Sequence, residues 1–138
     1  MKILVDADVL LDVALARAPH VESSAALLEW LEARPGVGIV AWHTVANLYY
    51  LMRGPRADDE VRRFIAELLG FLDVAGGTNE DVEYALDLPL KDFEDALQVA
   101  AARNAGATMI ATRNGRDYAK APIVAKHPNQ LLRGLQNR

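Results

Sequence analysis

The chain has 138 residues, half of them hydrophobic and a quarter charged, which indicates one folded domain and excludes a disordered protein. It contains no cysteine, so disulfide bonds, thiolate zinc sites and cysteine nucleophiles are excluded. The formal net charge of −4 argues against a broad, sequence-independent DNA-binding surface, which would need a basic face.

The beginning of the chain does not have the pattern of a signal peptide. Asp6, Asp8 and Asp12 interrupt its first apolar stretch, whereas a signal peptide needs an unbroken apolar region. No run in the sequence approaches the roughly 20 apolar residues that a membrane-spanning helix needs. We therefore expect a cytoplasmic protein that does not contact a membrane.

The first half of the chain alternates short apolar runs with helical patterns. Residues 2–5 predict a buried strand and residues 9–16 a first helix; a second helix begins near Glu22 and ends at Arg34-Pro35-Gly36. Residues 37–41 predict a second strand, and residues 44–52 a helix with Thr44 as its N-cap. After Gly54-Pro55, residues 58–69 predict an amphipathic helix.

The second half continues the alternation. Residues 71–75 predict a third strand, and Thr78 with Asp81 predicts a capping box for a helix that ends at Leu86. A helix over residues 92–104 ends at a C-terminal cap, Gly106. Two further strands over residues 108–112 and 123–125 precede a last helix over residues 128–136. Because one or two helices separate successive strands, we expect an α/β protein, a three-layer α/β/α sandwich with a five-stranded parallel sheet, in a single domain over residues 1–138.

Acidic residues stand at the places where such a sheet binds ligands. Asp6 directly follows the first strand, and the carboxyl ends of parallel strands border the ligand crevice of an open α/β sheet. Asp92 and Asp95 share one face at the start of a helix, and Asp117 follows the turn Asn114-Gly115. Converging carboxylates repel one another unless a divalent cation neutralises them. The pattern therefore favours a metal site.

Several polar residues also have a purely structural interpretation. Asp92 fits an N-cap, which is the interpretation we favour for it, and Asp117 could cap a short helix. We expect Asp12 to be solvated or paired within its helix, and Glu94 to be exposed. His43 beside Trp42 indicates a hydrogen-bonded structural group rather than a catalytic one.

Three segments together resemble the PIN-domain family of metal-dependent ribonucleases. The segment Ile3-Leu4-Val5-Asp6-Ala7-Asp8-Val9-Leu10-Leu11-Asp12 is similar to the family's opening motif, a strand ending in Asp, then usually Thr-Asn-Val-Leu. Asp95-Ala96-Leu97-Gln98-Val99-Ala100 resembles its central Asp-Ala-Leu-Ile motif. Thr112-Arg113-Asn114-Gly115-Arg116-Asp117-Tyr118 resembles its late Thr-Arg-Asn-x-x-Asp-Phe motif. The order and spacing agree over nearly the whole chain.

This resemblance implies a metal-dependent endoribonuclease and a set of site residues. Asp6, Asp95 and Asp117 would hold Mg²⁺ or Mn²⁺, with Asp8 and Asp92 as further candidate ligands. Thr112 and Asn114 would orient the acidic groups or the scissile phosphate, and the candidates for contact with RNA are Arg53, Arg113 and Arg116. Many bacterial members are toxins of VapC-type toxin–antitoxin pairs. The resemblance therefore also implies a homodimer and an antitoxin that lies in the active-site groove.

Two residues depart from the family pattern. Asn47 stands where the family usually has a Glu, so a neutral amide replaces an acid in the catalytic set, and Asp8 stands where Asn is usual and could restore the charge. The chain most resembles a branch that carries Asn at this place together with an Asp-Phe-Glu-Asp run. Asn47 favours one alternative, a catalytically weak PIN-like module that binds RNA or a partner.

A second alternative comes from the opening motif alone. Val5-Asp6-Ala7-Asp8-Val9-Leu10 also resembles the first motif of haloacid-dehalogenase-like phosphatases, with Asp6 as nucleophile and Asp8 as acid. That fold normally needs a cap domain and more residues, and the resemblance leaves residues 112–117 unexplained.

Overall fold

One parallel sheet forms the centre of the molecule. The structure, a computed structural model, describes residues 1–137, and within them five strands lie in the order β3-β2-β1-β4-β5. They are β1 (Ile3–Val5), β2 (Gly38–Ala41), β3 (Leu72–Ala75), β4 (Met109–Ala111) and β5 (Val124–Lys126). Neighbouring strands are parallel throughout. Every residue of the central β1 is buried, because its side chains pack in the apolar clusters on both faces of the sheet. The predicted five-stranded parallel sheet is confirmed.

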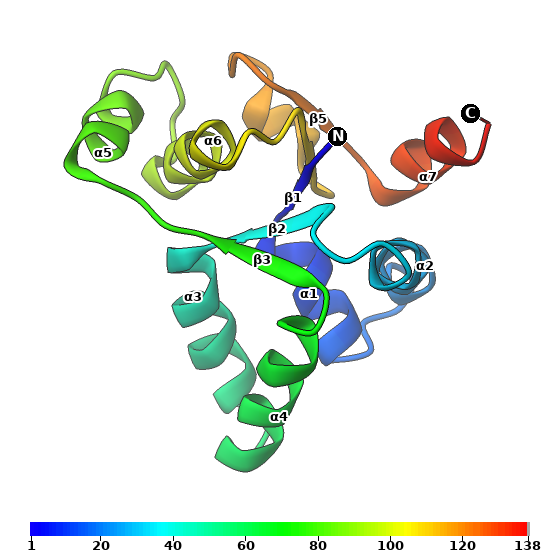
Figure 1. Cartoon of the computed structure of the whole chain (residues 1–138). Helices are drawn as coiled ribbons and strands as arrows, with labels where there is room; N and C mark the ends of the chain where they lie inside the picture. The colour runs from blue at the N-terminus through cyan, green and yellow to red at the C-terminus, as the bar shows by residue number, and fades with distance from the viewer. Residues whose placement is uncertain (138) are drawn as a thin grey trace.

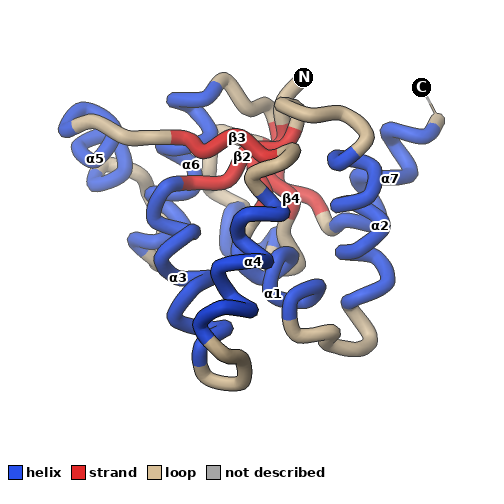
Figure 2. The backbone as a smooth tube through the Cα atoms, turned by 60° about the horizontal axis from the view of Figure 1, so that its bottom comes forward, coloured by secondary structure: helices blue, strands red, loops and turns tan. Residues whose placement is uncertain are grey.

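Helices cover both faces of this sheet. They are α1 (Ala7–Ala14), α2 (Val21–Glu32), α3 (Trp42–Arg53), α4 (Asp58–Leu68), α5 (Asn79–Leu86), α6 (Phe93–Ala105), the 3₁₀ helix η1 (Gly115–Tyr118) and α7 (Pro128–Gln136). Figure 1 shows α5 and α6 above the sheet and α1, α3 and α4 below it, and the tilted view shows the strands enclosed by helices (Figure 2). Two apolar clusters, one on each face, hold the three layers together.

The helix termini follow the sequence signals with two exceptions. The first helix, predicted over residues 9–16, spans Ala7–Ala14 because Asp6 caps it. Thr78 and Asp81 form the predicted capping box of α5, Asp92 caps α6, and Gly106 ends α6 in the left-handed conformation, with φ of 75°. The predicted N-cap role of Thr44 is wrong, because α3 begins earlier, at Trp42. The Thr44 hydroxyl instead donates a hydrogen bond across the sheet to α6. None of the helices described in residues 1–137 is long and apolar enough to cross a membrane.

The order of the strands creates a crevice beside β1. The chain places β2 and β3 on one side of β1 and then returns to the other side for β4 and β5. Such a reversal leaves an opening at the carboxyl ends of the strands, where ligands bind in open α/β sheets. Because Val5 is paired with Ala111, the next residues of both strands, Asp6 and Thr112, emerge next to each other.

Candidate active site

Asp6 is the centre of the candidate site and accepts four hydrogen bonds. Its Oδ1 atom accepts from the backbone N–H of Ala7 at 2.8 Å and from Gln98 Nε2 at 2.9 Å. Its Oδ2 atom accepts from the hydroxyls of Thr112 and Tyr118, both at 3.0 Å. The side chain is therefore both the N-cap of α1 and a buried carboxylate held by donors from α6, the end of β4 and η1.

Asp8 lies beside Asp6 and is less completely satisfied. Its Oδ2 atom accepts hydrogen bonds from the backbone N–H of Arg113 and from Asn114 Nδ2, both at 3.0 Å. Its Oδ1 atom is buried and has no hydrogen-bond partner among residues 1–137. Burial, with a smaller contribution from the negative charge of Asp6, raises the pKa of Asp8 to about 6. The ionised form of Asp8 is therefore destabilised by its surroundings, and a bound cation would stabilise it.

Asp95 is the second acid that the fold brings to this crevice. Its Oδ1 atom accepts a hydrogen bond from the Tyr118 hydroxyl at 3.2 Å. Partial burial, followed by the negative charges of Asp92, Asp6 and Asp117, raises the pKa of Asp95 to about 6. The charges of Asp6 and Asp117 therefore affect the ionisation of Asp95, so these predicted ligands lie close enough to Asp95 to interact with it electrostatically.

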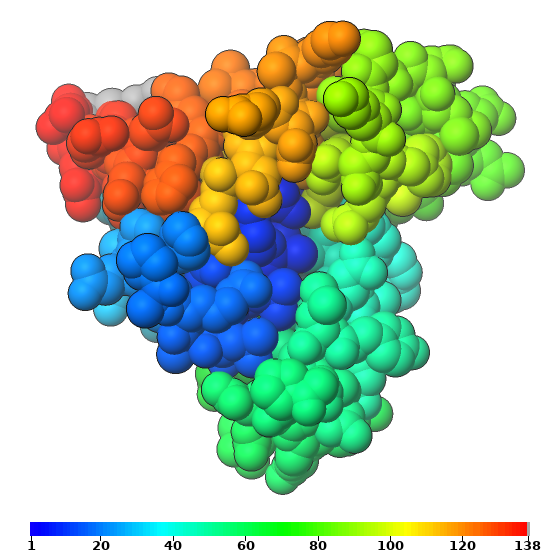
Figure 3. Space-filling model, turned by 180° about the vertical axis from the view of Figure 1, so that it is seen from behind, coloured from blue at the N-terminus to red at the C-terminus, as the bar shows by residue number. Residues whose placement is uncertain are grey.

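A cleft of about 360 Å³ adjoins these acids and also contains positive charge. It is lined by three acids and three cations. The acids are Asp92, Asp95 and the exposed Asp117, and the cations are Lys91, Arg116 and Lys120. In the view from behind, the blue start of the chain lies beside yellow-green, orange and teal segments from its middle and last parts (Figure 3). Segments that are far apart in the sequence therefore meet at this face.

The donor chemistry suits Mg²⁺ or Mn²⁺, although the carboxylates are not already gathered. All candidate ligands are oxygen atoms, as hard cations prefer, and the free Oδ1 of Asp8 is a buried oxygen without a donor. However, no group of three His, Cys, Asp or Glu residues within residues 1–137 is arranged to hold a metal ion. The residues fit such an ion by their chemistry, and the Tyr118 hydroxyl lies between two of them.

Asn47 stands on α3, the helix after the second strand, where the family usually has an acid, and Glu94 of α6 lies next to it. Asn47 on α3 hydrogen-bonds to the Glu94 side chain, which lowers the pKa of Glu94. Burial and the charges of Asp6 and Asp92 outweigh this bond, so the pKa of Glu94 is raised overall. Glu94 is half-buried, and the prediction that it is exposed is wrong because the first turn of α6 directs it toward Asn47. A carboxylate therefore accompanies the neutral amide.

The sequence interpretation missed two residues that hold Asp6. Gln98 is fully buried; it accepts a hydrogen bond from Thr44 at 3.2 Å and donates one to Asp6. Tyr118 is 2% exposed and donates toward Asp6 and Asp95. The signals were a polar residue within the apolar run after Asp95 and a Tyr where the family motif has Phe.

The predicted RNA contacts differ in their surroundings. Arg113 forms a two-pronged ion pair with Asp12, with Nε to Oδ2 at 2.6 Å and Nη2 to Oδ1 at 3.1 Å. Asp12 is fully buried and also binds Arg17, so the prediction of a solvated Asp12 is wrong. Because the Arg113 guanidinium is paired with this buried carboxylate, the structure argues against an RNA contact by Arg113. Arg53 is exposed and donates to the backbone of Arg56, whereas Arg116 lines the acidic cleft.

An open parallel sheet with acidic groups at its switch point defines a class of α/β proteins that bind ligands at this edge. Within this class, a family model described as PIN domain matches residues 2–116. The chain belongs to the PIN domain family. A search of curated proteins gives no match.

Solved structures show the same fold at low sequence identity. VapC20 of Mycobacterium tuberculosis, described as a Sarcin-Ricin loop cleaving toxin, matches with a TM-score of 0.70 and 19% identity, over 89% of this chain and 97% of that one. VapBC2 of Rickettsia felis, bound to a DNA fragment from its promoter, gives 0.72 and 14%, over 92% and 98%. A toxin–antitoxin complex from Klebsiella pneumoniae gives 0.68 and 19%, over 92% and 98%.

The haloacid-dehalogenase alternative has no support in these findings. The PIN match covers the opening motif on which that alternative rested. Thr112 and Asn114, which the phosphatase interpretation left unexplained, hydrogen-bond to Asp6 and Asp8. The opening motif and the late motif are therefore joined by hydrogen bonds at one place in the fold.

Proposed function

We propose that this protein is a metal-dependent endoribonuclease and the toxin of a type II toxin–antitoxin pair. The observation that carries the proposal is the cleft that Asp95 and Asp117 line together with Arg116, Lys91 and Lys120. The Tyr118 hydroxyl connects Asp95 of this cleft to Asp6. Carboxylates of this kind suit a divalent cation, and the cations suit the phosphates of a nucleic acid. The family membership and the likeness to VapC toxins support the same conclusion.

In this proposal Asp6, Asp95 and Asp117 hold Mg²⁺ or Mn²⁺, with Asp8 and Asp92 close by. Such an ion supplies the Lewis acid for hydrolysis of a phosphodiester bond. Lys91, Arg116 and Lys120 line the same cleft and fix the position of the RNA backbone by neutralising its phosphates.

Neutral side chains keep the acidic groups in place. Thr112 is fully buried; its hydroxyl lies 3.0 Å from Asp6 Oδ2 and 3.3 Å from Asp8 Oδ2. It also accepts the backbone N–H of Asn114 at 3.0 Å, which fixes the hydroxyl. Together with Gln98, these contacts hold the Asp6 carboxylate in one orientation, so a ligand meets a preorganised group.

The proposal is tested with Asp6→Asn, Asp95→Asn and the matched control Asp59→Asn, which removes an exposed carboxylate at the start of α4. Calorimetric titration with Mn²⁺ and cleavage of a mixed-sequence RNA are measured for each. We expect both site variants to lose metal binding and cleavage, and the control to retain them. Cleavage that persists in either site variant, or that proceeds equally in EDTA, would contradict the assignment.

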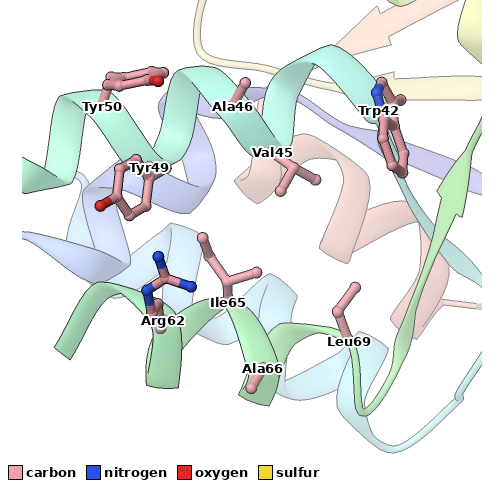
Figure 4. A pocket seen from close by; sticks show the side chains of 9 residues that line it. All are labelled: Trp42, Val45, Ala46, Tyr49, Tyr50, Arg62, Ile65, Ala66 and Leu69. Atoms are coloured by element: carbon pink, nitrogen blue, oxygen red, sulfur yellow. The ribbon is translucent and has the colours of Figure 1, made fainter. Parts of the chain in front are cut away.

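For the antitoxin we propose a groove between α3 and α4 instead of the active-site groove that the family resemblance implied; the two share no lining residue. The groove between α3 and α4 has a volume of about 590 Å³ and is lined mainly by apolar residues of the two helices. Figure 4 shows Val45 and Tyr49 of α3 facing, across it, Ile65 of α4 and Leu69, which directly follows α4. Trp42 at its end is 73% exposed and Leu69 is 51% exposed. An apolar groove of this kind accepts the apolar face of a helix.

The predicted homodimer stays a prediction, which light scattering tests.

The binding-module alternative keeps one observation in its favour. Asn47 supplies no charge, and its amide is engaged by Glu94. A module of this kind binds RNA in EDTA with the same affinity as in Mn²⁺ and does not cleave it. The titration above separates the two functions, because the nuclease requires metal binding that depends on Asp6.

A further inference from the structure

The hydroxyl of Tyr118 lies between the two carboxylates that the proposed nuclease needs for its metal. It is 3.0 Å from Asp6 Oδ2 and 3.2 Å from Asp95 Oδ1. The ring is 2% exposed, so the hydroxyl has no ready access to water. It therefore links the end of β1 to the first turn of α6.

We propose that the Tyr118 hydroxyl competes with the divalent cation for Asp6 and Asp95, and so sets the metal concentration at which the site fills. This inference rests on the proposed function and describes the regulation of that site. A hydroxyl has one proton, so it can satisfy only one of the two carboxylates fully at a time. A cation that binds both must displace this proton donor from them.

Two further observations agree with competition. Both oxygens of Asp6 already accept hydrogen bonds, so any ligand of Asp6 has to replace or share a donor. No three acidic or imidazole groups within residues 1–137 are arranged to hold a metal ion. The carboxylates are thus organised around a hydroxyl, and Phe at this position would leave them without it.

The test is Tyr118→Phe, which removes one oxygen and keeps the ring. A matched control is Tyr49→Phe, which also removes a hydroxyl that donates to a carboxylate, that of Asp58, but between α3 and α4. Mn²⁺ binding by each protein is measured by calorimetry at one fixed pH. The net free energy of a hydrogen bond to a charged group corresponds to about a tenfold change in affinity or more. We expect Tyr118→Phe to bind Mn²⁺ at least about tenfold more tightly than wild type, and Tyr49→Phe to bind it equally.

The other outcomes overturn the inference in distinguishable ways. If wild type binds Mn²⁺ and Tyr118→Phe binds it equally or more weakly, the hydroxyl does not compete with the cation. This outcome does not contradict the proposed nuclease function. Absence of Mn²⁺ binding in all three proteins overturns both proposals.

A measurement on the wild-type protein covers the case in which Tyr118→Phe does not fold. The ultraviolet absorption of a buried tyrosine responds when its hydroxyl loses a charged acceptor. We expect Mn²⁺ to change the tyrosine difference spectrum of wild type at the concentrations that fill the site. Binding without a spectral change contradicts displacement of the hydroxyl.

Discussion

Replacing Asp8 by Asn, the residue usual in the family motif, should stabilise the metal-free protein above pH 6. The pKa of Asp8 is about 6 in the fold against an ordinary 3.8, so the folded state holds its proton more tightly than the unfolded state. For an acid with a raised pKa, stability is unaffected below pH 4, falls as the pH rises from 4 to 6, and stays reduced above that. At about 1.4 kcal/mol for each tenfold change in proton affinity, the ionised carboxylate costs the fold up to about 3 kcal/mol.

The asparagine avoids this cost and can keep the contacts. Its amide oxygen can accept from the backbone of Arg113 and from Asn114, as Asp8 Oδ2 does, and its NH₂ group replaces the unpartnered Oδ1. Because Asp8 is partly solvated and coupled to Asp6, we expect a gain of about 1–2 kcal/mol at pH 8 that disappears toward pH 4.

Urea unfolding of wild type, Asp8→Asn and Asp59→Asn at several pH values between 4 and 8, in EDTA, measures this gain. The difference between wild type and Asp8→Asn should grow through the window from pH 4 to 6, and Asp59→Asn should show no such window. A variant that is less stable than wild type at pH 8, or whose difference does not depend on pH, would refute the reasoning. With saturating Mn²⁺ the order should reverse if Asp8 contributes to metal binding, since the cation stabilises only the charged side chain.

Three further predictions concern the partners of other acids in and around the site, namely Asp12, Asp6 and Glu94. Arg113→Met keeps the aliphatic stem but leaves Asp12 fully buried with a single cation, so the free energy of unfolding should fall by about 3 kcal/mol in urea titrations; a loss below 1 kcal/mol would show a solvated Asp12. Gln98→Met removes the donor that holds Asp6 Oδ1 and should cost about 1–3 kcal/mol, whereas unchanged stability would show that water replaces the amide. Asn47→Glu places a second carboxylate beside Glu94 and should cost about 1 kcal/mol in EDTA at pH 8, a loss that Mn²⁺ should reverse; stability equal to wild type in EDTA would show that the two acids do not meet.

Local signals in the sequence were enough to predict the layers and most helix termini. The capping box of Thr78 and Asp81, the N-cap of Asp92 and the glycine that ends α6 each depend on residues within one helical turn. The strands were equally clear, because buried parallel strands are short apolar runs. The place of Asp6 at the crevice followed from the alternation of strands and helices, which fixes where the carboxyl ends lie.

Contacts between distant residues were beyond these signals. Asp12 and Arg113 are 101 residues apart, and each alone has the pattern of a solvated charge on a helix or a turn. Their pairing depends on how the loop after β4 passes over α1, which no local pattern specifies. The same holds for Thr44, where a hydroxyl near a helix start predicted a cap, and the partner proved to be a buried Gln98 on another helix.

The two departures from the family pattern, Asn47 and Asp8, both concern the acidic groups of the site. Asn47 removes a charge from α3, and three acids of the site have a pKa that is raised by their surroundings. They are Asp8 on α1, and Glu94 and Asp95 on α6. Glu94 hydrogen-bonds to the very amide that replaced the acid, and Asp8 is bound by Asn114 of the late motif. Acidic side chains on α1 and α6 are thus present in the site, although α3 carries a neutral amide there. In the proposed nuclease, we therefore expect the metal affinity to depend on Asp8 and Glu94 as well as on residue 47.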